Sequence, residues 1–419
     1  MNLLLATFGE VMSYIGYVLL ALLILLVMIT VHELGHYIAG KILKFKINEF
    51  AIGFGPKLFS KTKKDGEVFS VRLLPIGGFC AFHGEDDTEE EDNQKEDNGQ
   101  PQQAEQSSQQ AEQSSQQSEQ TNEDNQTEQP KVDKANDPTT FNNQAPWKRL
   151  IVLVSGALMN YLLALLVIIF MFAVYGNTAL VTHYIDGPTS EYVQEYSFYK
   201  DDVILKANGK NVYLATDLMN AISGKNKNDK VNFTLLRQGK VVQAQITLRG
   251  DTHFNNLEDF TRLYKALGIP YELDAKGQIA KSGLYSTGVK YGFFDTIGRS
   301  FEYSFNLAGT IFKILGQLIT GNIGLSSMGG TVTTISVTAN AIKVGGFRNL
   351  LNIASFIGVN LAVFNLLPIP ALDGSKVVFT TIEWIRKKPI NRKVENIIHT
   401  VGLVLILIFA IFIDLQRCF

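Results

Sequence analysis

Long uncharged apolar runs dominate the hydrophobic pattern of this 419-residue chain. The first, Val11 to Val31, is 21 residues long, enough to cross a hydrocarbon core at about 1.5 Å per residue. A secretory signal peptide is the alternative, but such signals begin with positive charge, whereas the first basic residue here is Lys41. We therefore predict a first transmembrane helix within residues 1–40.

Three further apolar runs predict three more transmembrane helices. They are Ile151 to Gly176, about Leu350 to Leu367, and Ile397 to Ile413, within segments 147–176, 350–374 and 397–415. Basic residues flank the runs at Lys41, Lys44, Lys46, Lys148, Arg149, Arg386, Lys387, Lys388, Arg392 and Lys393. Because Lys and Arg are enriched in cytoplasmic loops, we predict these flanks to be cytoplasmic and both termini external.

The loop between the second and third runs is then external, and its pattern divides it in two. Residues 182–250 alternate apolar and polar positions around turn signals at Asn208-Gly209 and Gly239, which predicts a β-rich domain. Residues 251–345 are predicted to be a linker. Within the linker, Ser304 to Thr320 is apolar but interrupted by Lys313 and Gln317, which indicates an amphipathic helix at the membrane interface.

Residues 85–140 have a different composition, rich in Glu, Gln, Ser and Asn. Between Glu85 and Asp137 there are 17 acidic and 3 basic residues, a charge of −14. The chain carries −2, so the remainder carries +12. Such a polar segment cannot bury enough apolar surface to fold, and we predict a disordered cytoplasmic insert. The remaining Lys and Arg residues flank apolar helices and form no separate basic domain, which argues against nucleic-acid binding.

Candidate metal chemistry stands at the end of the first run, which reads His32-Glu33-Leu34-Gly35-His36. Two His residues four apart lie on one face of a helix, so both imidazoles can reach one metal ion. Glu33 lies between them and can accept a proton from water bound to the metal. The alternative is a helix end whose polar residues face water. Ionisable side chains so close to an apolar helix are costly, which favours a zinc site.

A third ligand is expected near the end of the third run, where Pro368 and Pro370 break the helix before Asp373. The predicted topology places this carboxylate on the same side of the membrane as the two His residues. The alternative for Asp373 is a turn residue before Gly374. Asn365 is either a hydrogen-bonding residue in helix packing or a donor to the oxyanion of a tetrahedral intermediate, and we favour the second role.

With these motifs the chain resembles the bacterial site-2 proteases, intramembrane zinc metalloproteases of the kind that regulates sigma factors. The shared motifs are HELGH at 32–36, GFGPKL at 53–58, RLLPIGGF at 72–79, GED at 84–86 and NLLPIPALDG at 365–374. Three positions depart from the usual pattern. Gly156-Ala157 replaces a Gly-Pro before Asn160, Gly374-Ser375 replaces a double glycine, and an external Gly-Pro motif appears only loosely around Ser326 to Gly330.

The resemblance implies that His32, His36 and Asp373 bind Zn²⁺ and that Glu33 is the general base. It implies a membrane-associated β-hairpin within residues 41–84 and a PDZ domain at 182–250, which either binds peptide ends or acts as a size filter. The expected fold is an α-helical membrane protein with four transmembrane helices, this hairpin and the external PDZ-like domain. The expected substrates are transmembrane proteins, such as anti-sigma factors and remnant signal peptides, within membrane lipid.

Two other functions remain open from the sequence. A zincin that acts on exposed loops is disfavoured because the motif continues directly from an apolar run. A membrane scaffold with a vestigial metal site is disfavoured because Glu33, His32, His36 and Asp373 are all present. The sequence predicts an intramembrane metalloprotease of the cell membrane, with its active site toward the cytoplasm.

Overall fold

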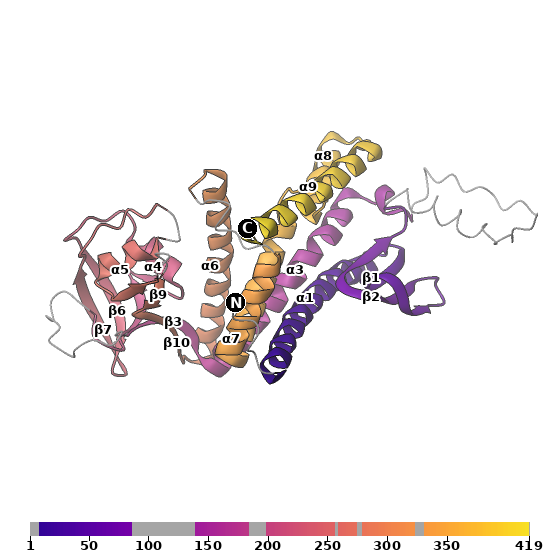
Figure 1. Ribbon diagram of the computed structural model, residues 1–419. Coiled ribbons are helices and arrows are strands. Elements are labelled where there is room, and N and C mark those ends of the chain that lie inside the picture. Colours follow the sequence, from indigo (N-terminus) through magenta and orange to yellow (C-terminus); the bar gives the residue numbers. More distant parts are fainter. Residues whose placement is uncertain are drawn as a thin grey trace, which may run out of the picture.

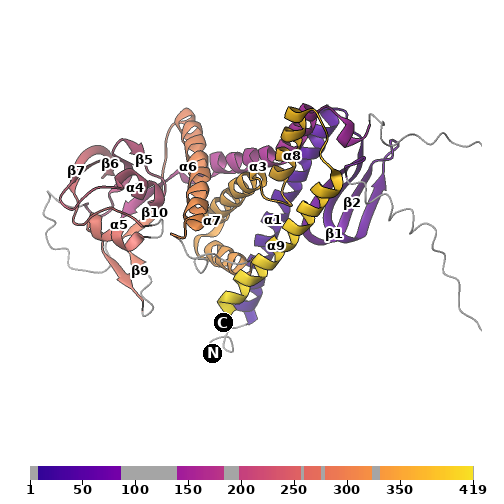
Figure 2. The same cartoon turned by 90° about the horizontal axis from the view of Figure 1, so that it is seen from above.

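The computed structural model describes residues 8–85, 139–183, 198–255, 259–274, 279–322 and 331–418. A bundle of long helices occupies the middle of the molecule, with a β-sheet domain on one side and a β-hairpin on the other (Figures 1 and 2). The predicted acidic insert over 85–140 and the loose motif at Ser326 to Gly330 lie almost wholly outside the described residues.

Four helices in the described part of the chain are long and apolar enough to cross a membrane, as predicted. They are α1 (Phe8–Ile42), α3 (Pro146–Tyr175), α7 (Thr331–Leu366) and α9 (Arg392–Cys418). The candidate spans within them are Met12–Ile42, Pro146–Tyr175, Thr334–Leu366 and Arg392–Leu415. The third is longer than the predicted run because α7 continues through Lys343 with a kink at Gly346, where φ is +57°.

Helix α3 lies at the centre of the bundle and packs against α1, α6 (Phe293–Ile319), α7 and α8 (Asp373–Arg386). Glycines let these backbones approach closely, as small residues do in membrane bundles. A Cβ added at Gly35 of α1 would lie 2.4 Å from the carbonyl oxygen of Ser155. One added at Gly358 of α7 would lie 2.9 Å from the Cβ of Ala164. Three helices therefore meet around α3 with little space between them.

The hairpin consists of β1 (Ile47–Thr62) and β2 (Val68–Phe82), which pair antiparallel on either side of the turn at Lys64–Gly66. Both strands bend, so that Ile52 is opposite Gly78 on one side and Val71 on the other. Residues 78–82 form one edge of this small sheet and pack against the end of α1. Phe82 joins Ala39, Phe45 and Phe141 in a buried cluster that fixes the hairpin to the helices. Association of the hairpin with a membrane stays a prediction.

The sheet domain (residues 177–289) contains an antiparallel sheet with the strand order β10-β3-β4-β6-β7, and β5 pairs with β4. Its strands are β3 (Asn177–Thr182), β4 (Val203–Ala207), β5 (Lys210–Asn211), β6 (Lys230–Arg237), β7 (Lys240–Thr247) and β10 (Leu284–Val289). Helices α4 (Ala215–Ile222) and α5 (Phe260–Leu267) contribute Leu218 and Leu263 to its buried core. A separate pair, β8 (Tyr271–Leu273) and β9 (Ile279–Ser282), precedes β10.

This domain is larger than the predicted 182–250, and the predicted linker at 251–345 is wrong in this respect. Strand β10 pairs with β3 along its length, from Leu284 opposite Thr182 to Val289 opposite Asn177. Helix α5 is buried in the same core. These partners lie about a hundred residues apart in sequence, and β10 is short, so local periodicity gave no sign of the pairing.

The amphipathic helix predicted at Ser304 to Thr320 is the second half of α6. Its buried face, with Tyr303, Leu307 and Ile311, packs against α3 and α7, while Phe305 and Phe312 are exposed. Helix α6 therefore stands beside the bundle (Figure 1), and its location at a membrane interface stays a prediction.

Candidate metal centre

The last turns of α1 bring two imidazoles together. His32 and His36 are each 7% exposed, and their Nε2 atoms lie 3.2 Å apart. The rings meet nearly perpendicular, with centroids 4.8 Å apart. Two ring nitrogens at this distance can both contact one atom placed between them, as ligands of a common metal ion do.

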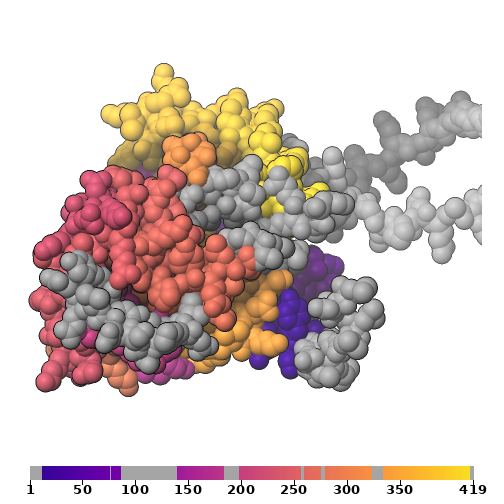
Figure 3. Space-filling model, turned by 60° about the vertical axis from the view of Figure 1, so that its left-hand side comes forward, coloured from indigo at the N-terminus to yellow at the C-terminus, as the bar shows by residue number. Residues whose placement is uncertain are grey.

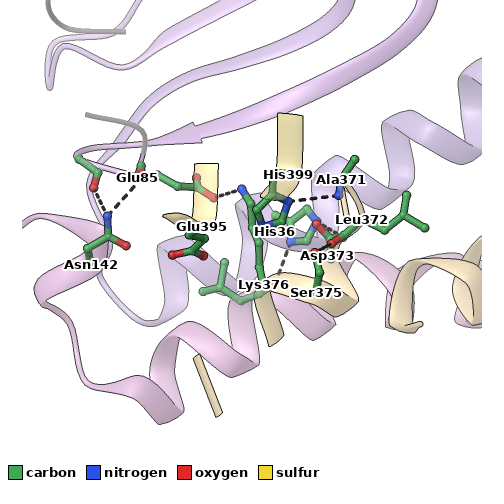
Figure 4. Close-up of polar contacts among 12 residues, drawn as sticks. His36, Glu85, Asn142, Ala371, Leu372, Asp373, Ser375, Lys376, Glu395 and His399 are labelled. Carbon is green, nitrogen blue, oxygen red and sulfur yellow. Dashed lines mark hydrogen bonds and ion pairs between the residues drawn. The ribbon is translucent and has the colours of Figure 1, made fainter. Parts of the chain in front are cut away.

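Asp373 completes a group of three oxygen and nitrogen donors. It is the first residue of α8, after a turn in which Pro368 and Pro370 end α7 and Ala371 adopts a left-handed φ of +75°. Asp373 Oδ2 lies 2.9 Å from His32 Nε2 and 3.2 Å from His36 Nε2. Figure 4 shows His36 and Asp373 facing each other beside the turn. Among the described residues, this is the one group of three or more side chains placed to hold a metal ion.

The three donors fit zinc. A tetrahedral ion with bonds of about 2.0–2.1 Å spaces its ligand atoms about 3.3 Å apart, close to the observed 2.9–3.2 Å. Two imidazoles and one carboxylate are a donor set of catalytic zinc sites that leaves one position open. Gly156 of α3 leaves room for the two imidazoles, because a Cβ at this position would lie 2.4 Å from His36 Nε2 and 2.7 Å from His32 Cε1.

Helix α3 also faces the second nitrogen of each imidazole. His36 Nδ1 lies 2.8 Å from the carbonyl oxygen of Val152, so Nδ1 donates its hydrogen there and Nε2 keeps its lone pair for a metal. His32 Nδ1 lies 3.3 Å from Asn160 Nδ2 and 3.4 Å from Asn365 Nδ2. The predicted Asn365 is thus beside the donor group, in the last turn of α7.

Glu33 lies between the three donors and the hairpin, since His32, His36 and Asp373 are all near enough to act on its carboxylate electrostatically. A Cβ added at Gly78 of β2 would lie 3.4 Å from Glu33 Cγ, so the side chain of Glu33 lies beside the strand edge at residue 78. The open edge of the hairpin and the predicted general base therefore share one space at the end of α1.

Ion pairs between separate elements support the turn that carries Asp373. Arg149 of α3 donates to Glu383 of α8 at 2.7 Å, and both side chains are at least 95% buried. Arg392 of α9 lies 3.0 Å from Glu383. Burial alone would raise the pKa of Glu383, but the Ile390 N–H and the two guanidinium groups outweigh it and hold the pKa below its ordinary value. Helix α8 is thus fixed to its neighbours through one carboxylate.

Helix α9 contacts the same turn directly. The Ala371 N–H donates to His399 Nδ1 at 3.2 Å, and a Cβ added at Gly402 would lie 2.1 Å from Pro370 Cβ. Lys376 donates to Glu85 at 2.8 Å (Figure 4). A cavity of about 430 Å³ lies between these elements, beside Ala371.

The sequence predicts His32, His36, Asp373, Glu33 and Asn365 for this site, and the structure places all five at one end of the bundle. The sequence assigns no role to Asn160 or to the Val152 carbonyl. A buried Asn within an apolar run is a signal that could have been used. A backbone carbonyl leaves no mark in a sequence, so the Val152 contact could come only from coordinates.

Comparison with known proteins bears on this geometry. Residues 20–409 match Peptidase family M50. Zinc metalloprotease RasP of Bacillus licheniformis is 29% identical over an alignment 430 positions long, which covers 93% of this chain and 96% of the relative. Regulator of sigma-W protease RasP of Bacillus subtilis is 27% identical, covering 93% of this chain and 95% of the relative.

The match to the family extends over most of the chain, and the relatives are similar along their whole length. The helices at 12–42, 146–175, 334–366 and 392–415 agree with a multi-pass membrane protein. The chain therefore belongs to peptidase family M50, the site-2 proteases, and is a zinc metalloprotease.

Proposed function

We propose that this protease hydrolyses peptide bonds within the membrane-spanning segments of other proteins. The observation that carries the proposal is the origin of the three donors. Two come from within a candidate membrane span, Met12–Ile42, and the third follows directly after another, Thr334–Leu366. A metal site built from such helices meets a substrate that is itself in the bilayer.

In this proposal His32, His36 and Asp373 hold the zinc ion. When bound there, zinc acidifies water and polarises the carbonyl of the scissile peptide bond. Glu33 accepts the proton from that water and passes it to the leaving amine. Asn365, beside His32, donates its amide N–H to the oxygen on which negative charge develops. His36 is kept in the right tautomer by the Val152 carbonyl, 2.8 Å from its Nδ1.

A helical substrate hides its peptide bonds, so the scissile segment must become extended before hydrolysis. The edge of the hairpin at residues 78–82 is suited to hold it, because an extended peptide can add to an open strand edge. The position of Gly78 supports this role, since a Cβ there would be in ordinary contact, 3.4 Å, with Glu33 Cγ. Substrate held along this edge would pass the general base.

The sheet domain is proposed to be a PDZ-like domain outside the cell, where it limits access by bulky substrates. It continues from the end of α3 that lies away from the donors, and from its own side it stands in front of much of the bundle (Figure 3). With the basic flanks inside, both termini are external and the active site faces the cytoplasmic side. Single-span regulatory proteins, anti-sigma factors among them, and remnant signal peptides are the proposed substrates.

Glu33→Gln tests this function. In lipid nanodiscs, with a single-span substrate whose only cleavable bonds lie in its apolar segment, we expect cleavage to fall about 10²–10⁴-fold. Zinc content should stay at the wild-type level, because Glu33 is not one of the three donors. Glu272→Gln, an exposed change in the sheet domain, is the matched control. Cleavage by Glu33→Gln at the control rate would contradict the proposal.

A further inference from the structure

The environment of His32 differs from that of His36 in one respect. The Nδ1 of His36 faces a carbonyl oxygen, which can only accept a hydrogen bond. The Nδ1 of His32 faces two side-chain amides, those of Asn160 and Asn365. An amide offers either an oxygen or N–H groups, so the partner of His32 depends on which end it presents.

Metal binding decides which end is needed. A neutral imidazole that ligates through Nε2 carries its one hydrogen on Nδ1. That N–H is buried, since His32 is 7% exposed, and a buried donor without an acceptor costs about 1–3 kcal/mol. One of the two amides must therefore present its oxygen to His32.

Asn160 is the better candidate for this acceptor. It is fully buried in the middle of α3, and its Oδ1 has no hydrogen-bond partner among the described residues. Asn160 Nδ2 lies 3.3 Å from His32 Nδ1. Rotating the amide by 180° exchanges Nδ2 with Oδ1, so that the oxygen faces His32 Nδ1 instead. The pairing satisfies both the imidazole N–H and the orphaned oxygen.

Asn365 is placed for a different task. It lies in the last turn of α7 and is only partly buried, next to the turn that carries Asp373. If Asn160 accepts from His32, the N–H groups of Asn365 remain available to a substrate carbonyl.

Resting on the proposed zinc site, we propose that Asn160 is a positioning residue whose side-chain oxygen accepts the Nδ1 hydrogen of His32. This contact fixes the tautomer and ring orientation of His32, as the Val152 carbonyl does for His36. Helix α3 thus supplies the outer hydrogen bond for both His ligands, and the two Asn residues have separate roles.

The test is zinc affinity of the purified full-length protein, measured by competition with a chelator. Asn160→Ala removes the acceptor, and we expect zinc to bind about 10–100-fold more weakly. Asn160→Asp keeps an oxygen and removes the N–H donors, so its affinity should stay close to that of the wild type. Asn177→Ala is the matched control, because Asn177 is 1% exposed but lies in β3.

Asn365→Ala separates the two amides. We expect it to bind zinc like the wild type and to lose cleavage. The midpoint of thermal unfolding of the metal-free variants shows whether Asn160→Ala weakens the fold more than Asn177→Ala does. If Asn160→Ala does not fold, Asn160→Asp decides alone, because it is expected to bind zinc only when the oxygen faces His32.

Three outcomes would overturn the inference: weak zinc binding by Asn160→Asp, wild-type binding by Asn160→Ala, or a loss of affinity in Asn365→Ala instead. Failure of the zinc site itself has a different signature. In that case His32→Ala would also leave zinc binding unchanged.

Discussion

The most apolar 18-residue stretches of helices α3 and α9 have the same mean hydropathy, yet they have very different surroundings. Of that stretch in α3, 39% is buried within the protein, against 11% in α9. The buried face of α3 carries Gly156, Ala157 and Asn160, whereas α9 exposes Leu403, Leu405 and Leu407.

The difference teaches that apolarity marks a span but does not assign it a role. Within a bundle, small residues permit close backbone approach and polar side chains form buried hydrogen bonds. On a helix at the edge of the bundle, large apolar side chains face the lipid instead. The face of α3 that meets α1 and α7 is therefore where the site is built, and α9 touches the site only through one turn.

The largest effect is expected from Gly156→Ala in α3. The new Cβ would lie 2.4 Å from His36 Nε2, so an imidazole or the helix must move. We expect zinc affinity and cleavage to fall at least about 100-fold, the upper end for changes beside a metal ligand. Gly16→Ala in α1, where a Cβ meets nothing within 4 Å, is the control. Unchanged zinc content in Gly156→Ala would contradict the conclusion that the site is built on this face of α3.

Arg149→Met should have the next largest effect, on stability. It leaves Glu383 buried with one guanidinium partner removed, and breaking a buried ion pair costs about 3–5 kcal/mol. We expect a lower midpoint of thermal unfolding in detergent and reduced cleavage. The double variant Arg149→Met with Glu383→Met should recover part of the loss. A double variant less stable than either single one would show that the pair is not the cause.

The lowered pKa of Glu383 predicts a pH dependence of stability. A carboxyl group whose pKa is lower in the folded state stabilises the fold above its unfolded pKa of about 4.3, and this contribution is lost as the pH falls below that value and through the lower folded pKa. The unfolding midpoint of the wild type should therefore fall on acidification from about pH 5 to about pH 3. Glu383→Gln, which cannot titrate, should show a smaller fall over the same range.

Much of the bundle and of the candidate site was predictable because both depend on patterns of residues that are close together in the sequence. Uncharged runs gave the four spans, and the spacing of His32 and His36 required only helical geometry. Asp373 was inferred from depth in the membrane, since two prolines and a carboxylate follow an apolar run. The start of α7 was missed because Lys343 and the kink at Gly346 interrupt its pattern. Pairing of β10 with β3 was missed because it depends on contacts distant in sequence.

A smaller effect is expected where α9 touches the site. A Cβ in Gly402→Ala would overlap Pro370, and α9 can shift more readily than α3 because little of it is buried. We expect cleavage to fall about 10-fold, the lower end for residues that support a metal ligand, with zinc retained. Gly298→Ala in α6, which has open space around it, should cleave like the wild type. A loss as large as that of Gly156→Ala would make α9 an equal part of the site.

The smallest effect is expected on the lipid-facing side of α9. Leu405 is 60% exposed and Leu165 of α3 is 5% exposed, so the same change tests both helices. Leu405→Ala leaves no cavity and should alter the free energy of unfolding by less than about 0.5 kcal/mol. Leu165→Ala creates a cavity and should cost about 2–5 kcal/mol. Reversible unfolding in detergent micelles measures both. Equal losses would mean that α9 is covered by protein in the membrane, because only a packed neighbour could give Leu405 the contacts that Leu165 has.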